Sequence, residues 1–387
     1  MAEALNMTAV LGFSVDCGHD GRDSPSNKAD FVSYVFEAAD GSQGKWGALR
    51  AMDGHPEPYT VTHVQLGNEE NVAQLVGRFA DAAAAMERRA TQLGRGGVLT
   101  YVLGSDCRSD GGGSIVNDGN TSTILQELKA AGLCERTIWD WHVMPSVQGY
   151  NQSAARDTFN LAAFDNLRKK FNCPCRVAIL EENLCQAHFT RALGDAFTSN
   201  FLQSQPLVAM QATSQIWSRA GNFNDGCGEG HVYTLPNQTW LSPPGWASSM
   251  TFNSFQPNAL RVSWTRGGTG FPDQTVDVFA AVSDDEKELT IRLVNAGNQS
   301  RLLELMLLSS SAAGAVAVEA GSATLASLTS PLTGAAYTNQ SGGVNPVGDP
   351  LLISPRMSNV SFDATGKVPH LLPAQSFQVL TMRLLKT

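Results

Sequence analysis

The sequence has no stripe of basic residues and no long apolar run. Its 387 residues include 27 Lys and Arg against 36 Asp and Glu, a formal net charge of -9, and the basic residues are scattered singly. A chain of this kind lacks the electrostatic footprint that nucleic-acid binding requires. No apolar run reaches the roughly 20 residues that span a bilayer. The sequence therefore predicts neither nucleic acid nor a membrane as a partner.

Motifs for nucleotide binding, serine-nucleophile catalysis and zinc binding are also missing. The segments "GRGG" (94–97) and "DGGGS" (110–114) have neither the Lys-Ser/Thr of a phosphate loop nor a GxGxxG spacing. No Gly-X-Ser-X-Gly nucleophile elbow occurs. Cys173 and Cys175 are too close for the usual two-residue zinc spacing, and no matching Cys or His pair follows. We expect neither a metal nor a cofactor.

Cysteines and glycosylation sequons bear on the compartment of the protein. The seven cysteines are an odd number, which leaves at least one thiol unpaired or bonded to another chain. Acceptor sequons for N-glycosylation occur at Asn6, Asn120, Asn151, Asn237, Asn298, Asn339 and Asn359. Together the sequons predict an extracellular or secretory-pathway protein, although "MAEALNMTAVLGFSV" carries Glu3 where a signal peptide would be positively charged. The sequence leaves the oligomeric state, monomer or homo-oligomer, open.

Short β-rich runs alternate with helical patterns through the first two thirds of the chain. The predicted strands lie at 7–15, 62–68, 97–105, 137–143, 175–182 and 206–217. The predicted helices lie at 28–38, 71–93, 121–133, 153–171 and 188–204. Strands that alternate with helices of this length indicate parallel βα units.

From about residue 259 the pattern changes to short strands separated by Gly, Asn, Ser and Pro. The predicted strands are "ALRVSW" (259–264), "TVDVFAAV" (275–282), "ELTIRLVN" (288–295), "LLELMLLS" (302–309) and "SFQVLTMRLL" (376–385). Such strands, with no good helix between them, are typical of an antiparallel sandwich. We therefore predict an α/β plus all-β protein, with a partial (β/α)8 TIM-type barrel at 1–258. A jelly-roll-like β-sandwich is predicted at 259–387.

Only six βα units are visible, whereas a closed barrel of this class needs eight. If the strand at 206–217 is strand eight, counting back makes 175–182 strand seven and 62–68 strand four. The chain is then expected to begin at strand three, as an N-terminally truncated barrel with a gap between 7–15 and 206–217. Exposed strand edges favour aggregation, so we expect a poorly soluble and weakly active chain.

Paired carboxylates end two of these strands. Glu69 and Glu70 follow the strand at 62–68, and Glu181 and Glu182 end the strand at 175–182. Hydrolysis of a glycosidic bond needs one carboxyl group to protonate the leaving oxygen and another to attack or to activate water. Active sites of such barrels lie at the carboxyl ends of their strands.

Two further residues at strand ends fit this chemistry. Asn68, directly before Glu69, can donate a hydrogen bond to the sugar hydroxyl next to the reacting carbon. His142, at the end of the strand at 137–143, can orient or tune a carboxylate. On its own His142 would be read as a core histidine, and the tryptophans of this region as core residues.

Longer stretches resemble family 51 α-L-arabinofuranosidases. "WGALRAMDGHPEPYTVTHVQLGNEEN" (46–71) is similar to the segment that leads to their Gly-Asn-Glu acid/base motif, and "CRVAILEEN" (175–183) to their nucleophile strand. "VYTLPNQTWLSPPGWASSMTFNSFQPNAL" (232–260) resembles their junction into the C-terminal sandwich, and "LLPAQSFQVLTMRL" (371–384) their last strand. The resemblance implies a retaining exo-acting enzyme that releases terminal α-L-arabinofuranosyl residues from arabinose-containing polysaccharides or oligosaccharides.

The resemblance also implies roles for single residues. Glu69 matches the acid/base, Asn68 the adjacent sugar-binding amide, and Glu181 the nucleophile in a Glu-X-Asn register that ends at Asn183. Glu182 remains the alternative nucleophile, because only one of two adjacent strand residues points into the site. Two substrate-binding positions follow at His142 and Gln215. The family has a Tyr two residues after the His, where this chain has Met144.

Two other functions stay open. One is another glycosidase of the same barrel clan, such as a β-xylosidase or an endoglucanase, against which the resemblance of the sandwich argues. The other is a non-catalytic or degenerate carbohydrate-binding relative that lacks the first two barrel strands. Turnover of an aryl arabinofuranoside separates an enzyme from the second of these.

Overall fold

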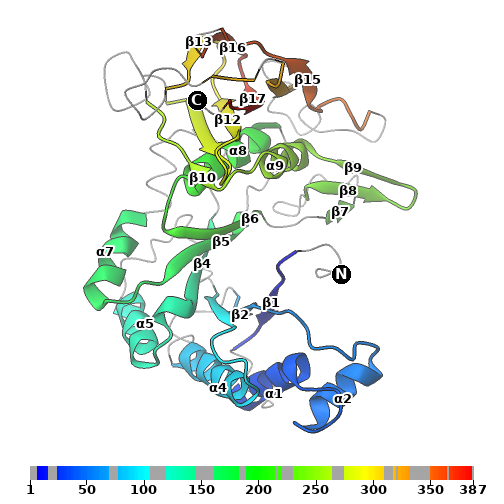
Figure 1. Cartoon of the computed structure of the whole chain (residues 1–387), viewed down its shortest axis with the longest axis vertical. Helices are drawn as coiled ribbons and strands as arrows, with labels where there is room; N and C mark the ends of the chain where they lie inside the picture. Colours follow the sequence, from blue (N-terminus) through cyan, green and yellow to red (C-terminus); the bar gives the residue numbers. More distant parts are fainter. Residues whose placement is uncertain are drawn as a thin grey trace. The chain divides into compact units, whose positions relative to one another are not determined.

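The protein is described here from a computed structural model, in which two compact units are found (Figure 1). The described residues are 7–15, 24–68, 77–104, 119–143, 161–182, 189–213, 217–219, 230–263, 274–308, 317–319, 321–330, 349–363 and 366–385. The first unit, called the barrel unit, comprises Met1–Val143, Phe159–Glu182 and Leu207–Ala212. The second, called the sandwich unit, comprises Met144–Thr158, Asn183–Pro206 and Thr213–Thr387. The domain boundary between residues 258 and 259 stays a prediction.

A six-stranded sheet forms the centre of the barrel unit. Its strands are hydrogen-bonded in chain order, and the pairs from β1 to β5 are parallel. They are β1 (Val10–Phe13), β2 (His63–Leu66), β3 (Thr100–Leu103), β4 (Thr137–Val143), β5 (Arg176–Glu182) and β6 (Val208–Thr213). Between them come the helices α1 (Pro25–Phe36), α2 (Lys45–Met52), α4 (Arg78–Gln92), α5 (Gly119–Ala130) and α7 (Leu161–Phe171). The predicted fold class, an incomplete (β/α)8 barrel followed by an antiparallel sandwich, is confirmed. Within the described residues β1 and β6 are the two outer strands of this sheet.

The two faces of β4 differ in what they contact. Trp139 and Trp141 both pack edge-on against Phe164 of α7, so this face is covered by the helical layer. Side chains alternate along a strand, and Ile138 therefore points to the other face, where it clusters with Val102 and Ala178 of the neighbouring strands. Asp140 and His142 share that inner face by the same alternation. The polar residues of β4 are thus held on the inside of the sheet.

The sandwich unit contains two antiparallel sheets. The larger has the order β10-β11-β12-β17-β14-β15 and the smaller pairs β13 with β16. Their bounds are β10 (Asn258–Ala259), β11 (Val276–Val282), β12 (Glu288–Asn295), β13 (Arg301–Met306), β14 (Thr324–Thr329), β15 (Arg356–Asn359), β16 (Lys367–Leu372) and β17 (Ser376–Arg383). The unit also contains α8 (Phe189–Gln203), α9 (Pro243–Asn253) and a small sheet of β7 (Trp217–Arg219), β8 (Val232–Leu235) and β9 (Gln238–Leu241).

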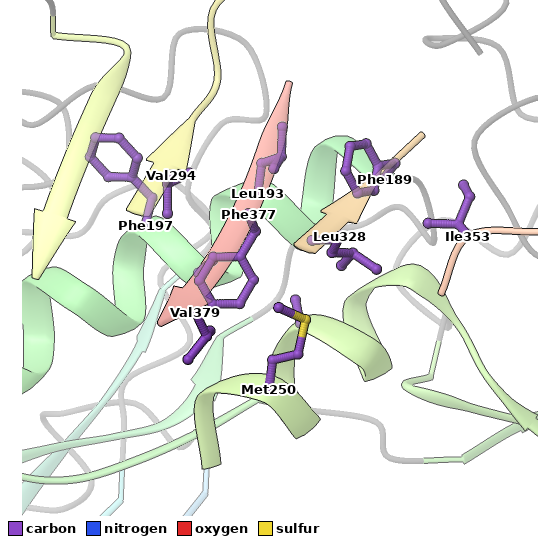
Figure 2. Packing of buried hydrophobic residues seen from close by; sticks show 12 residues of the cluster. Phe189, Leu193, Phe197, Met250, Val294, Leu328, Ile353, Phe377 and Val379 are labelled. Carbon is purple, nitrogen blue, oxygen red and sulfur yellow. The ribbon is translucent and has the colours of Figure 1, made fainter. Parts of the chain in front are cut away.

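Alternation along β17 builds two cores in the sandwich unit. Leu380 and Met382 join the cluster that includes the β16 residue Leu372, which lies between the two sheets. Phe377 and Val379 point the other way and pack with residues of α8 and α9 (Figure 2). Because strand side chains alternate, β17 can fill both cores at once. Packing on both faces explains why the residues of this strand other than Thr381 and Arg383 are buried.

Most predicted elements of the barrel unit occur at or near their predicted positions, and some elements were not predicted. The strand expected at 137–143 coincides with β4. Helix α2, the β7–β9 sheet, β14, β15 and β16 had no counterpart in the prediction. The strand expected from "ALRVSW" is wrong beyond its first residue, since β10 ends at Ala259 and residues 260–263 are not in a strand.

Candidate active site

Three of the five predicted site residues lie in the described part of the sheet, at the carboxyl ends of their strands. Asn68 is two residues beyond β2, His142 is the penultimate residue of β4, and Glu181 is the penultimate residue of β5. The strand order places β3 between β2 and β4, and β4 beside β5. Since the carboxyl ends of parallel strands meet at one edge, these residues share the edge where such barrels hold their active sites.

Two glycines shape the chain at the end of β2. Gly67 has a φ of 85°, a left-handed conformation that side chains with a Cβ disfavour. A Cβ on Gly104, at the end of β3, would lie 2.0 Å from the Gly67 carbonyl oxygen. The close approach of the two strand ends thus requires glycine at Gly104. Asn68 directly follows Gly67, and Gln65 Nε2 of the same strand donates to Asn68 Oδ1 over 3.2 Å.

A β-bulge places Glu181 beside His142. In the pairing of β4 with β5, Asp140 lies opposite Ala178 and His142 lies opposite Glu181. Two residues on β4 therefore correspond to three on β5, so β5 contains one extra residue. The backbone N–H of Leu180, at this bulge, donates to Asp140 Oδ1 over 2.9 Å. The extra residue turns Glu181 toward the inner face that His142 occupies.

His142 lies between two carboxylates. Its Nδ1 is 3.3 Å from Glu181 Oε2, and its Nε2 is 3.2 Å from Asp140 Oδ2. The side chain of Asp140 is completely buried and that of His142 is 7% exposed, whereas the Glu181 side chain keeps 26% of its surface. Glu181 is therefore the member of this set that solvent, or a substrate, can reach.

Gln65 connects the end of β2 to this cluster. The same Nε2 that donates to Asn68 also donates to Asp140 Oδ2 over 3.3 Å. A continuous chain of polar contacts thus runs from Asn68 through Gln65, Asp140 and His142 to Glu181. The three predicted residues that the structure describes are joined by two that were not predicted.

The sequence carried a signal for the two missed residues. Asp140 and Gln65 are polar residues inside otherwise apolar strands, and Asp140 is two positions before His142. The period of two along a strand puts residues so spaced on one face. Because Asp140 shares a strand face with His142, the sequence supports Asp140 as a further candidate site residue.

Other predicted residues fall outside the described part of the chain. The structure does not describe the segments that contain Glu69, Asn183 and Gln215. Glu182 is the last residue of β5, and its side chain is not described. Among the described residues no cluster of three or more His, Cys, Asp or Glu side chains could hold a metal ion. None of the described helices has the length and apolar character needed to cross a membrane.

Comparison with known proteins finds relatives among α-L-arabinofuranosidases. Residues 1–112 match the family model of the α-L-arabinofuranosidase 1 domain. A stretch of 55 residues is 44% identical to an extracellular exo-α-L-arabinofuranosidase of Streptomyces chartreusis, and one of 74 residues is 30% identical to α-L-arabinofuranosidase 2 of Arabidopsis thaliana. The resemblance to family 51 α-L-arabinofuranosidases is confirmed.

The fold is similar to that of solved structures over a longer span. The chain matches the arabinose complex of an α-L-arabinofuranosidase from Thermotoga maritima with a TM-score of 0.70, and an arabinose-bound family 51 enzyme, MgGH51, with 0.71. These matches cover 99% of this chain, and 77% and 56% of those chains, at 15% and 16% identity. The sequence matches span 14% and 18% of this chain, and 7% and 11% of the two curated relatives.

Proposed function

We propose that this chain is the catalytic part of a retaining, exo-acting α-L-arabinofuranosidase that cleaves terminal arabinofuranosyl residues from arabinose-containing polysaccharides or oligosaccharides. The observation that carries the proposal is the partly exposed Glu181 carboxylate beside His142 at the carboxyl edge of an incomplete barrel. Asn68 follows β2 at the same edge of the sheet, directly before Glu69. The arabinofuranosidase relatives and the fold support the choice of sugar.

In the proposed reaction Glu181 attacks the anomeric carbon of a terminal arabinofuranose. Glu69, as the general acid, gives its proton to the glycosidic oxygen as the bond to the leaving sugar breaks. The product is a covalent arabinosyl ester of Glu181, with inverted configuration. Glu69 then removes a proton from water, the water oxygen attacks the same carbon, and the carboxylate of Glu181 leaves. Two inversions give net retention.

Three substrate-binding roles complete the proposal. Asn68 is assigned a hydrogen bond to the hydroxyl next to the anomeric carbon, a contact that strengthens as positive charge develops in the transition state. His142 is assigned the orientation of Glu181, which its 3.3 Å contact supports. Gln215 is assigned to the sugar on the basis of the family resemblance. A retaining enzyme requires the Glu69 and Glu181 carboxyl groups to lie about 5–5.5 Å apart.

Turnover of 4-nitrophenyl α-L-arabinofuranoside by the purified chain tests the activity. We expect release of nitrophenolate, with the α-anomer of arabinose as the first product by proton NMR. Peptide mapping of protein quenched during turnover of a fluorinated dinitrophenyl arabinofuranoside should locate the sugar on Glu181. A first product with the β-anomeric configuration would refute the retaining mechanism. No turnover together with calorimetric binding of arabino-oligosaccharides would instead establish the non-catalytic carbohydrate-binding relative.

An extracellular or secretory-pathway location is part of the proposal. The described sequon residues Asn237, Asn298 and Asn359 are exposed, as glycan acceptors must be. The disulfide of Cys134 and Cys173 is of a kind that persists in oxidising compartments. Expression in a eukaryotic secretory host, with the chain fused behind a signal peptide, should give a protein whose electrophoretic mobility increases after glycan removal. Unchanged mobility would refute glycosylation.

A further inference from the structure

The buried carboxylate of Asp140 is the centre of the polar chain. Its Oδ1 accepts from the Leu180 backbone N–H, and its Oδ2 accepts from Gln65 and lies 3.2 Å from the His142 ring. A buried carboxylate is costly unless its oxygens are hydrogen-bonded, and an ionised carboxylate only accepts. Two donors, the Leu180 N–H and the Gln65 amide, thus bind Asp140, and the His142 ring lies within hydrogen-bond distance of the same carboxylate.

The His142 ring cannot satisfy both of its neighbours when it is neutral. A neutral imidazole has one N–H and one lone pair, whereas an imidazolium has two N–H groups. Both ring nitrogens of His142 lie within 3.3 Å of a carboxylate oxygen, one from Asp140 and one from Glu181. A lone pair on either nitrogen would face a carboxylate oxygen instead of donating to it. Only the doubly protonated ring donates to both.

We propose that Asp140 is a positioning residue that holds His142 as an imidazolium, so that a fixed positive charge stands beside the nucleophile Glu181. This inference rests on the proposed function, because it needs Glu181 to be the nucleophile. Asp140 touches no substrate in this role and acts through His142. The bulge in β5 serves the same arrangement, since the Leu180 N–H that it turns toward Asp140 helps to stabilise the charge there.

The positive charge affects the two steps of the reaction differently. In the first step Glu181 loses its negative charge as its bond to the anomeric carbon forms, so a neighbouring cation does not assist. In the second step water attacks that carbon, its proton passes to Glu69, and the breaking bond returns the electron pair to Glu181. A cation beside Glu181 stabilises the charge that develops there. Asp140 is therefore expected to speed hydrolysis of the arabinosyl ester.

Asp140→Asn removes the charge and leaves the shape. The Asn amide can still accept from Leu180 through its oxygen, while its NH2 group faces His142 Nε2. The ring then becomes neutral, with its one proton on Nδ1 for Glu181. We expect kcat on the nitrophenyl arabinofuranoside to fall about 10- to 100-fold, because a charge-assisted contact is lost from the second step. KM should fall in parallel, since the ester accumulates, and kcat/KM should change less than about threefold.

The protonation of His142 is measured independently of activity. Long-range nitrogen-proton NMR of the wild-type chain at neutral pH should show both ring nitrogens of His142 protonated, with the signals assigned by their loss in His142→Gln. In Asp140→Asn only Nδ1 should be protonated. Asp165→Asn, an isosteric change in a partly exposed ion pair of α7, is the matched control and should resemble wild type in both measurements.

The outcomes separate the two proposals. If the wild-type chain neither turns over the substrate nor acquires a sugar on Glu181, the proposed function fails, and the role of Asp140 fails with it. If the wild-type chain is active but its His142 ring carries one proton, only the role of Asp140 fails. Equal falls of kcat and kcat/KM in Asp140→Asn would also overturn it, because that is the pattern of simple structural damage. Should Asp140→Asn not fold, the wild-type spectrum decides. Two protonated nitrogens on the His142 ring support the role of Asp140, and a single protonated nitrogen overturns it.

Discussion

Glu181 lies opposite His142 because β5 contains one residue more than β4 between their paired positions. In a regular ladder Leu180 would occupy that place, and Glu181 would point to the face where Trp139 and Trp141 meet α7. The bulge thus brings Glu181 to the candidate site. Bulges are frequent next to active sites, where they re-aim a side chain in this way.

The first prediction follows from this geometry. Glu181→Ala should reduce kcat on the nitrophenyl arabinofuranoside at least roughly a thousandfold, because the covalent step is lost, while Glu182→Ala should cost less than about tenfold. Added azide should restore turnover of Glu181→Ala and give the β-configured arabinosyl azide, since azide enters from the vacated side. Loss of activity in Glu182→Ala with an active Glu181→Ala would reverse the assignment.

Glu69, which the structure does not describe, is predicted to behave as the acid/base. Glu69→Ala should lose activity on poor leaving groups yet form the arabinosyl ester almost normally from dinitrophenyl substrates, which need little protonation. Azide should restore turnover here too, but with the α-configured azide, because it attacks the ester from the side that water uses. Equal losses on good and poor leaving groups, or a β-configured azide, would remove this assignment.

The strands of the barrel unit could be predicted because each is a short apolar run between helical patterns. Helix α2 was missed because its stability comes from outside its own sequence. "KWGALRAM" contains a glycine, and its first N–H groups are held by Glu37, which lies before the helix. Tertiary hydrogen bonds of this kind leave no periodic pattern.

The candidate site was predicted only in part, for a related reason. Strict alternation from Ala178 along "AILEE" selects Glu182, and only the resemblance to a Glu-X-Asn register selected Glu181. The bulge in β5 brings Glu181 to the inner face despite this alternation. It is accompanied by the hydrogen bond from the Leu180 N–H to Asp140 on β4, which no pattern within one strand can predict. Gln65 and Asp140 were missed because their partners lie on other strands.

Loss of the disulfide should destabilise the barrel unit. Cys134 and Cys173 are bonded across a separation of 39 residues, which ties the start of β4 to the segment before β5. Chain-entropy arguments assign such a loop about 4 kcal/mol. Cys134→Ala/Cys173→Ala should therefore lower the free energy of unfolding by about 3–4 kcal/mol in urea titrations. A loss below about 1 kcal/mol would contradict the prediction.

Cys175 supplies a comparison within the same segment. It is a buried free thiol, and burial raises its pKa to about 12. Because the thiolate is the reactive form, Cys175 should resist alkylation in the folded protein at neutral pH. Iodoacetamide labelling with peptide mapping should find Cys175 modified only after denaturation. Rapid labelling of the native chain would show that this segment opens.

Arg50 is expected to be essential for the stability of the barrel unit. It is fully buried, and within the described residues its guanidinium donates to five backbone carbonyl oxygens. The acceptors are the carbonyl groups of Tyr34, Val35, Glu37, His55 and Pro56. The Val35 carbonyl also accepts from the Tyr59 N–H. Lys has at most three donors on a compact head, so Arg50→Lys leaves at least one of the other four carbonyls unsatisfied. Urea titration of Arg50→Lys should show a free energy of unfolding about 2–4 kcal/mol lower than that of wild type. Arg95 is exposed, and the control Arg95→Lys should change the free energy of unfolding by less than about 0.5 kcal/mol.

The last prediction concerns acid stability and Glu37. Its buried carboxylate accepts from the Gly47 and Trp46 backbone N–H groups at the start of α2, and it pairs with Arg89 of α4. Burial opposes ionisation of Glu37, but the hydrogen bonds from Gly47, Arg89 and Trp46 outweigh it and hold its pKa below the ordinary 4.5.

A depressed carboxyl pKa means that the folded protein binds the proton less readily than the unfolded chain. The stability that Glu37 contributes is therefore fully present above about pH 4.5 and is lost as pH falls through the lower folded pKa. Glu37→Gln should be less stable than wild type at neutral pH, and its free energy of unfolding should fall less steeply below pH 4.5. The exposed Glu57→Gln is the matched control and should keep the wild-type pH dependence. Parallel curves for wild type and Glu37→Gln between pH 3 and 7 would mean that Glu37 is not a source of the acid sensitivity.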